Sequence, residues 1–210
     1  MSELTRLPPR DSGDRLTLDE YLADFNARFW NPRNTSAWKF ERRQTFRQPE
    51  SPSWNAFNEG NWDLSIQLLE ERRPKLKDYF DRVSAHGFSV FRIRVVEDSL
   101  SPYLVWELNS LLIRQQCGAS ITVVNPDMLE KWERDGVLPE IFVIGPDTVY
   151  EVLYDSDGVA EGAIRYVDEP TARRWMIFMD ALEGSGEPLD AFFNREVAGL
   201  RPTECEAPSA

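Results

Sequence analysis

The sequence predicts an α/β fold, with an α+β arrangement as the alternative, in which helices cover a mixed β-sheet. The first observation is a change of hydrophobic period over residues 88–136, where strand and helix patterns alternate as a β-α-β-α unit. The second is a run of three strand patterns over 140–167, which predicts an antiparallel meander. The third is a mainly helical stretch over 17–86, which predicts an N-terminal subdomain packed against the sheet.

The first predicted helix is marked by its N-terminus. Thr17 and Glu20 have the spacing of a capping box, and apolar residues then recur every three to four positions, which predicts a helix over about 18–30. Pro32 ends this helix, because the residue before a proline disfavours the helical conformation. Residues 37–46 alternate in polarity instead, and this pattern indicates a strand or an extended arm.

Two more helices are predicted before residue 87. A short helix over 53–60 is closed by Gly60, and a longer one runs from Asn61 or Trp62 to His86. Pro74 should kink or divide the longer helix, because proline lacks the backbone N–H and clashes with the preceding turn.

The β-α-β unit begins with an alternating strand over 88–97. Ser101 and Pro102 give a helix start with proline in the first turn, and this helix ends at Gly118. A second strand follows over 120–125, and a unit of this kind is expected to be parallel and right-handed. The remaining predicted elements are a helix over 125–136, strands over 140–145, 148–155 and 162–167 with a turn at Asp157-Gly158, a helix from Pro170, and a helix over 187–198.

Composition divides the chain into four segments. Polar, proline-containing stretches at both ends predict a disordered N-terminus over 1–16 and a disordered tail over 200–210. Between them we expect a mainly helical, aromatic-rich subdomain over 17–86 and an α/β domain over 87–199.

The charge balance limits the classes of partner. The chain has 24 Lys and Arg against 36 Asp and Glu, a net charge of −12, and residues 95–210 carry 22 of the acidic side chains. Because nucleic acids are bound mainly through phosphate neutralisation by Lys and Arg, DNA binding is not expected. Two cysteines without a Cys-x-x-Cys motif suit a reducing cytoplasm, and no apolar stretch is long enough to predict a membrane span.

The single histidine, His86, excludes several kinds of site. One histidine and the two cysteines, Cys117 and Cys205, make a poor ligand set for zinc or iron, so we predict no metal and no cofactor. His86 itself is expected to close a helix. No Gly-rich phosphate loop, Gly-x-Ser-x-Gly elbow or kinase signature is present.

An arginine-aromatic cluster is the first candidate site. Arg92 and Arg94 occupy alternate positions of a predicted strand, and the next helix offers Tyr103, Trp106 and Glu107 within about one turn. Paired guanidinium groups beside aromatic rings suit a carboxylate, a phosphate or an acidic peptide. The alternative is an internal ion pair between Glu107 and one of the two arginines, which would lock the helix to the sheet.

The second candidate is a run of aromatic residues interleaved with arginines over 30–62. Its composition is typical of a protein interface and also of a surface on which nucleic-acid bases stack. The alternative is that these rings form the core of the N-terminal subdomain. The residues predicted as a partner surface are Trp38, Glu41, Arg43, Trp54 and Trp62.

Three segments resemble an uncharacterised domain family of actinobacteria over about residues 17–182. They are Trp38-x-x-Glu41-x-x-Gln44-x-Phe46, Ser53-Trp54-x-Ala56-Phe57-x-x-Gly60-x-Trp62, and Arg92-x-Arg94-Val95-Val96 followed by Tyr103-x-x-Trp106-Glu107. The resemblance implies a gene neighbourhood with Xre-type helix-turn-helix regulators and no established reaction. A weaker similarity to a phospholipase-D-like half-domain implies no hydrolase, because the His-x-Lys motif is absent: Gly87 and Phe88 follow His86.

The leading functional hypothesis is a non-catalytic cytoplasmic regulatory or accessory protein. It would bind a small anionic molecule or a protein partner, such as a helix-turn-helix regulator or a biosynthetic protein. The alternative is a metal-independent enzyme of specialised metabolism, with Glu107 or Glu41 as general acid/base and Arg92 or Arg94 as substrate anchors. A third hypothesis is RNA binding through the aromatic N-terminal face.

Overall fold

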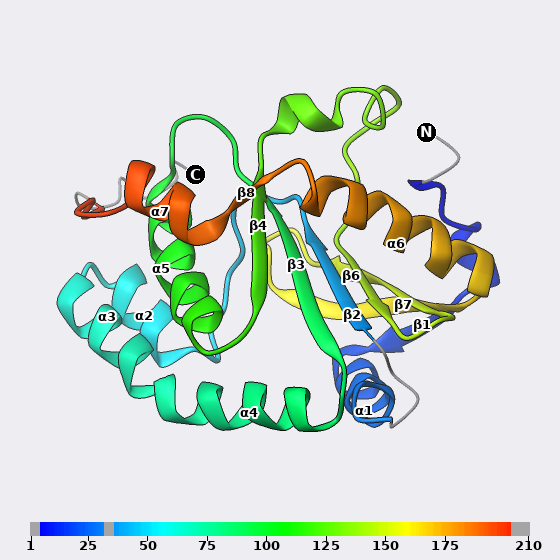
Figure 1. The fold of residues 1–210 in the computed structure, drawn as a ribbon, viewed down its shortest axis with the longest axis horizontal. Helices are drawn as coiled ribbons and strands as arrows, with labels where there is room; N and C mark the ends of the chain where they lie inside the picture. Colours follow the sequence, from blue (N-terminus) through cyan, green and yellow to red (C-terminus); the bar gives the residue numbers. More distant parts are fainter. Residues whose placement is uncertain (1–4, 32–35, 203–210) are drawn as a thin grey trace.

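A computed structural model describes residues 5–31 and 36–202. Pro32, Cys205 and most of the predicted tail lie outside the described residues. Within the described part, an eight-stranded mixed sheet forms in the order β1-β7-β6-β5-β2-β3-β4-β8 (Figure 1). The strands are β1 (Asp14–Thr17), β2 (Ser36–Glu41), β3 (Ser89–Val95), β4 (Ser120–Val124), β5 (Ile141–Ile144), β6 (Thr148–Tyr154), β7 (Ala160–Val167) and β8 (Glu187–Pro188).

The helices follow the expected order, and the α/β class is confirmed. They are α1 (Leu18–Phe29), α2 (Pro52–Asn58), α3 (Trp62–Glu71), α4 (Arg73–Ala85), α5 (Pro102–Gln116), α6 (Glu169–Glu183) and α7 (Leu189–Glu196), with 3-10 turns η2 (Arg10–Ser12) and η3 (Pro126–Leu129). Among the residues described, no helix combines the length and the apolar character needed to cross a membrane.

Local signals explain where the helices begin. Thr17 and Glu20 form the predicted capping box of α1, and Ser101 accepts a hydrogen bond from the backbone of Leu104 at the start of α5. The long helix is divided at Arg72, just before Pro74, into α3 and α4. The helix predicted over 125–136 is confined to the 3-10 turn η3, followed by turns.

The parallel unit is larger than predicted. β3 and β4 are parallel and joined by α5, and β5, β6 and β7 form the antiparallel meander, both as predicted. In addition, β2 pairs in parallel with β3 and antiparallel with β5, so α2, α3 and α4 form a crossover between β2 and β3. Residues 17–86 thus contribute a central strand of the main sheet, which differs from a separate helical subdomain packed against it.

The N-terminal segment also differs from the expected disorder. Residues 14–17 form β1, which pairs antiparallel with β7 at the edge of the sheet, and Arg10 pairs with the buried Glu151. The edge strand offers unpaired backbone groups that a polar segment can satisfy without an apolar pattern of its own. Composition alone therefore does not reveal this strand.

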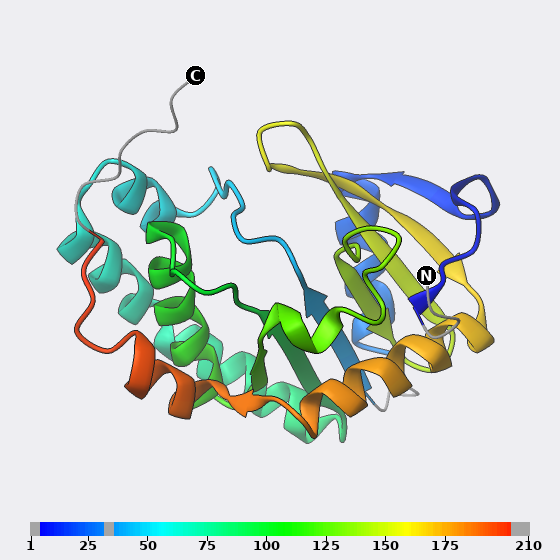
Figure 2. The same cartoon turned by 90° about the horizontal axis from the view of Figure 1, so that it is seen from above.

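The two faces of the sheet have different chemistry. One face is apolar: Trp38, Phe40 and Ile93 pack beneath α6, which carries Trp175 and Phe178. The other face bears a stripe of charged residues on β2 and β3. We call it the charged face; the register pairs Lys39 with Arg92 and Glu41 with Arg94 there. α6 packs on the apolar face, whereas α4 packs against the other face. Figure 2 shows the arm after β2 passing between α5 and the β6–β7 hairpin.

Gly162 permits the approach of β1. Its φ is +150°, and a Cβ at this position would clash with the backbone carbonyl oxygen of Leu16. We expect Gly162→Ala to detach β1 and to lower the free energy of unfolding by about 2 kcal/mol. Faster tryptic cleavage after Arg10 and Arg15, with urea denaturation, measures this effect. Gly60→Ala is the matched control, since Gly60 has a φ of +79° and no heavy atom lies within 4 Å of the point that its Cβ would occupy; equal losses in the two variants would contradict the prediction.

Candidate functional site

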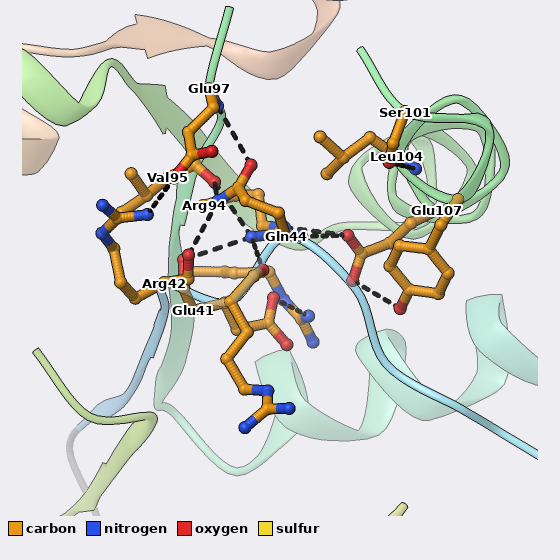
Figure 3. Close-up of polar contacts among 12 residues, drawn as sticks. Glu41, Arg42, Gln44, Arg94, Val95, Glu97, Ser101, Leu104 and Glu107 are labelled. Atoms are coloured by element: carbon orange, nitrogen blue, oxygen red, sulfur yellow. Dashed lines mark hydrogen bonds and ion pairs between the residues drawn. The ribbon is translucent and has the colours of Figure 1, made fainter. Parts of the chain in front are cut away.

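Arg94 and Glu107 form a buried ion pair between β3 and α5. The Arg94 Nε and Nη2 atoms donate to Glu107 Oε2 at 2.8 and 2.6 Å, and the Arg94 side chain is 0% exposed (Figure 3). Burying a guanidinium group is tolerated only when its donors are satisfied. The alternative to a ligand pocket in the sequence analysis is an internal ion pair of Glu107 with Arg92 or Arg94. The structure contains this ion pair, and the arginine is Arg94.

Backbone carbonyls satisfy the rest of the Arg94 guanidinium. Its Nη1 atom donates to the carbonyls of Arg43 at 2.7 Å and Val95 at 2.9 Å. The adjacent Gln44 donates to the carbonyl of Val95 at 3.0 Å and accepts from the backbone N–H of Glu97 at 3.0 Å (Figure 3). These bonds hold the arm after β2 against the end of β3.

The two predicted rings also bond within the protein. The Tyr103 hydroxyl donates to Glu107 at 3.2 Å and accepts from Gln48 at 2.9 Å, and burial raises the pKa of this phenol. Trp106 donates through its indole N–H to the Ser53 hydroxyl at 3.0 Å. Arg94, Tyr103 and Glu107 are therefore packed against one another, with no space for a guest among these three side chains.

An open cleft lies directly beside this packed group. Its volume is about 490 Å³, and it is bounded by α5, β2, β3, the arm before α2, and the β6–β7 hairpin. Three of the five predicted pocket residues, Arg92, Trp106 and Glu107, line it, whereas Arg94 and Tyr103 do not. We call this space the cationic cleft. Its other charged lining residues are Lys39, Glu41, Arg47, Glu50, Arg72 and Arg114.

Glu41 neutralises two cations at the floor of the cleft. Its carboxylate oxygens lie 2.5 Å from Lys39 Nζ and 2.5 Å from Arg92 Nη1. Burial alone would raise the pKa of Glu41, but Arg92 and Lys39 outweigh burial and hold this pKa well below its ordinary value. Glu41 is therefore an anion at neutral pH, whereas an efficient general acid or base has a pKa near the operating pH. Both oxygens of Glu107 are likewise engaged, by Tyr103 and Arg94.

Arg114 is a functional candidate that sequence reasoning missed. It is half-buried at the wall of the cleft, and none of the described residues accepts a hydrogen bond from its guanidinium or forms an ion pair with it. Burial and the neighbouring charges of Arg92 and Arg72 lower the pKa of Arg114 to about 10. The signal was the helical spacing: Glu107 and Arg114 are seven residues apart, which places both on one side of α5.

Glu140 lies at the end of the same charged face. Its Oε1 atom accepts from the backbone N–H groups of Arg42 at 2.8 Å and Arg43 at 2.6 Å, whereas Oε2 is buried and has no partner among the described residues. Burial, and then the charge of Glu41, raise the pKa of Glu140 to about 7. This carboxyl group therefore changes its charge near neutral pH.

The predicted partner surface is distributed over different parts of the structure. Trp38 is buried beneath α6, on the face opposite Glu41. Trp54 is buried and Trp62 is half-buried, and both pack with α5. Arg43 is exposed and its guanidinium lies 5.1 Å from the ring centroid of Tyr154. These side chains do not form one continuous exposed surface. Most of the aromatic run is buried, partly beneath α6 and partly against α5, and it does not form the core of a separate N-terminal subdomain.

The remaining sequence candidates have structural explanations. His86 caps the C-terminus of α4, and its Nδ1 atom lies 2.8 Å from the carbonyl oxygen of Arg82. Asp155 holds the predicted hairpin turn by accepting from the backbone N–H groups of Asp157 and Val159. Over residues 5–31 and 36–202, His, Cys, Asp and Glu side chains do not gather in threes suited to a metal ion.

A second cleft, of about 400 Å³, lies at the carboxyl ends of β3 and β4. This is the edge at which parallel sheets commonly bind ligands. Here, however, acidic side chains predominate, and the lining cation Arg195 is paired with Glu187 and Glu196. The cationic cleft differs because it is lined by Arg114, whose guanidinium has no acceptor among the described residues.

Comparison with known proteins gives a family without an assigned activity. Searches of curated proteins and of solved structures found no match for this chain. A family model described as "Domain of unknown function (DUF6879)" matches residues 23–194, which include every helix and strand lining the cationic cleft. The chain therefore belongs to the DUF6879 family.

Proposed function

We propose that this protein is a non-catalytic binding protein whose cationic cleft holds a small anionic molecule. The observation that carries the proposal is Arg114, a guanidinium group that faces the cleft among like charges and lacks an acceptor among the described residues. Such a group raises the free energy of the unliganded protein, and an anion supplied from outside would satisfy it.

Size and composition of the cleft support a small molecule. A volume of about 490 Å³ lies within the range of small-molecule sites. Guanidinium groups bind carboxylates and phosphates through paired, charge-assisted hydrogen bonds. The neighbouring Arg94–Glu107 pair and Gln44 fix the walls, so the donors are held in place before a ligand arrives.

Cytoplasmic location and partnership with a helix-turn-helix regulator or a biosynthetic protein remain part of this proposal. The cysteine content supports the first. The second follows from the family resemblance, and the acidic C-terminal half would suit a basic partner surface.

Arg114→Gln should abolish stabilisation by anions. With a Kd on the order of 1 mM, about 20 mM inorganic phosphate stabilises the folded protein by about 1.8 kcal/mol, which corresponds to a Tm increase of about 4–7 °C. Differential scanning fluorimetry against chloride at equal ionic strength measures the shift. We expect the shift in the wild type and its loss in Arg114→Gln.

A matched control and the unliganded Tm separate binding from folding. Arg173 is an exposed arginine on α6, remote from the cleft lining, so Arg173→Gln should retain the full shift. Without phosphate, Arg114→Gln should unfold at a Tm no lower than the wild type, because it relieves repulsion from Arg72 and Arg92. Equal phosphate shifts in all three proteins would contradict an anion site in the cleft.

A further inference from the structure

We propose that the ligand of the cationic cleft is a dianionic phosphate monoester carrying an aromatic group. This inference rests on the proposed function and specifies the class of anion. It follows from the excess of positive over negative side chains in the cleft lining and from the aromatic rings that line the same cleft.

The charge count favours a dianion. When the ion pairs Arg94–Glu107 and Arg47–Asp157 are set aside, the lining keeps four cations, Lys39, Arg72, Arg92 and Arg114, against the two carboxylates Glu41 and Glu50. Two positive charges are therefore in excess. A carboxylate or a sulfate ester would neutralise one of them, whereas a phosphate monoester carries about −1.5 to −2 at pH 7 and neutralises nearly two.

The donors lie on elements that meet at one end of the cleft. Arg114 is near the C-terminus of α5, and Arg72 is at the junction of α3 with α4. Their charges and that of Arg92 act on one another, since Arg92 and Arg72 both lower the pKa of Arg114. Ser110 lines the cleft one turn before Arg114 and adds a hydroxyl donor. A phosphate has three terminal oxygens, so it can accept from several of these groups at once.

Three aromatic side chains also line the cleft, and Tyr154 is the most exposed of them, because it is half-buried whereas Trp106 is 2% and Phe46 is 6% exposed. Trp106 lies eight residues before Arg114, about 12 Å along α5 at 1.5 Å per residue. Phe46 on the arm and Tyr154 on the hairpin also line the cleft, with their ring centroids 4.9 Å apart. Rings prefer edge-to-face and offset contacts with other rings. A ligand with an aromatic group joined to its phosphate therefore matches both ends.

Isothermal titration calorimetry with matched probes tests the inference. The probes are 2-naphthyl phosphate, 2-naphthyl sulfate and inorganic phosphate, titrated into the full chain at constant ionic strength. The two naphthyl esters have nearly the same shape, but the sulfate keeps one charge at every pH used. At pH 8 we expect the naphthyl phosphate to bind roughly tenfold more tightly than the sulfate. At pH 5, where the phosphate is a monoanion, the ratio should fall to about one.

The results with two variants and three probes separate the dianion, the aromatic group and anion binding itself. Arg114→Gln should remove the preference for naphthyl phosphate, and Arg173→Gln should retain it. Equal affinities of the two esters at pH 8, both weakened in Arg114→Gln, would overturn the dianion and leave the proposed function intact. Naphthyl phosphate binding no more tightly than inorganic phosphate would overturn the aromatic group. Failure of all three probes to bind would overturn the proposed function itself.

Discussion

Glu107→Ala is expected to lower the free energy of unfolding by about 3–5 kcal/mol. The substitution leaves the guanidinium of Arg94, which is 0% exposed, without its carboxylate. It also removes the acceptor of the Tyr103 hydroxyl. Urea denaturation followed by circular dichroism measures the loss.

Two comparisons identify the buried charge as the cause. Glu70 also accepts two hydrogen bonds from one arginine, Arg73, at 2.7 and 2.8 Å, but on the protein surface, so Glu70→Ala should cost less than about 1 kcal/mol. The double variant Arg94→Met with Glu107→Leu removes both charges and should recover more than half of the loss. A loss in Glu107→Ala as small as that in Glu70→Ala would show that the pair is not buried in solution.

The alternation of residues was sufficient to predict much of the site. The alternation over residues 37–46 implies that Lys39 and Glu41 lie on the side of the strand opposite Trp38 and Phe40, and the structure has them so. Arg92 and Arg94 similarly share a face because strand side chains have a period of two. What alternation cannot supply is the neighbour of each strand, since pairing depends on tertiary contacts.

The central position of β2 is the clearest example. Its sequence pattern identified an extended segment, but only the parallel register with β3 brings Glu41 beside Arg94 and Lys39 beside Arg92. Glu41 forms its ion pair with Arg92, two positions before its register neighbour, and Arg94 pairs with Glu107 from α5. The sequence contained both acids and both arginines, and the choice of partners required the sheet order.

Arg114 shows a different reason for a missed residue. An arginine in the last turn of a helix is usually explained by the helix dipole, so its spacing from Glu107, which places both on one side of α5, does not by itself mark it as functional. Its importance comes from what surrounds it, namely Arg72 and Arg92 from separate elements, and from the lack of a hydrogen-bond acceptor or ion-pair partner among the described residues. That a guanidinium group lacks an acceptor can be recognised only once the fold is known.

Glu140 is expected to make stability fall as pH rises between about 4.5 and 7. The pKa of this carboxyl group is raised from 4.5 to about 7 in the folded protein. Within this interval the unfolded chain has an ionised Glu140, while the folded protein retains the proton, so the folded state binds more protons and loses stability with increasing pH. The change amounts to roughly 3 kcal/mol by pH 8. Glu41 acts oppositely: its lowered pKa gives stabilisation that is lost only as pH falls below about 4.5.

Glu140→Gln tests this titration, because glutamine keeps an oxygen for the N–H groups of Arg42 and Arg43 but cannot ionise. Urea denaturation between pH 5 and 8 should find the variant within about 1 kcal/mol of the wild type at pH 5 and about 2–3 kcal/mol more stable at pH 8. Glu130 is exposed, so Glu130→Gln should follow the wild-type curve. Parallel curves for Glu140→Gln and the wild type would mean that Glu140 is already ionised throughout this range, and the charged face would then carry one more anion and a smaller positive excess than the structure indicates.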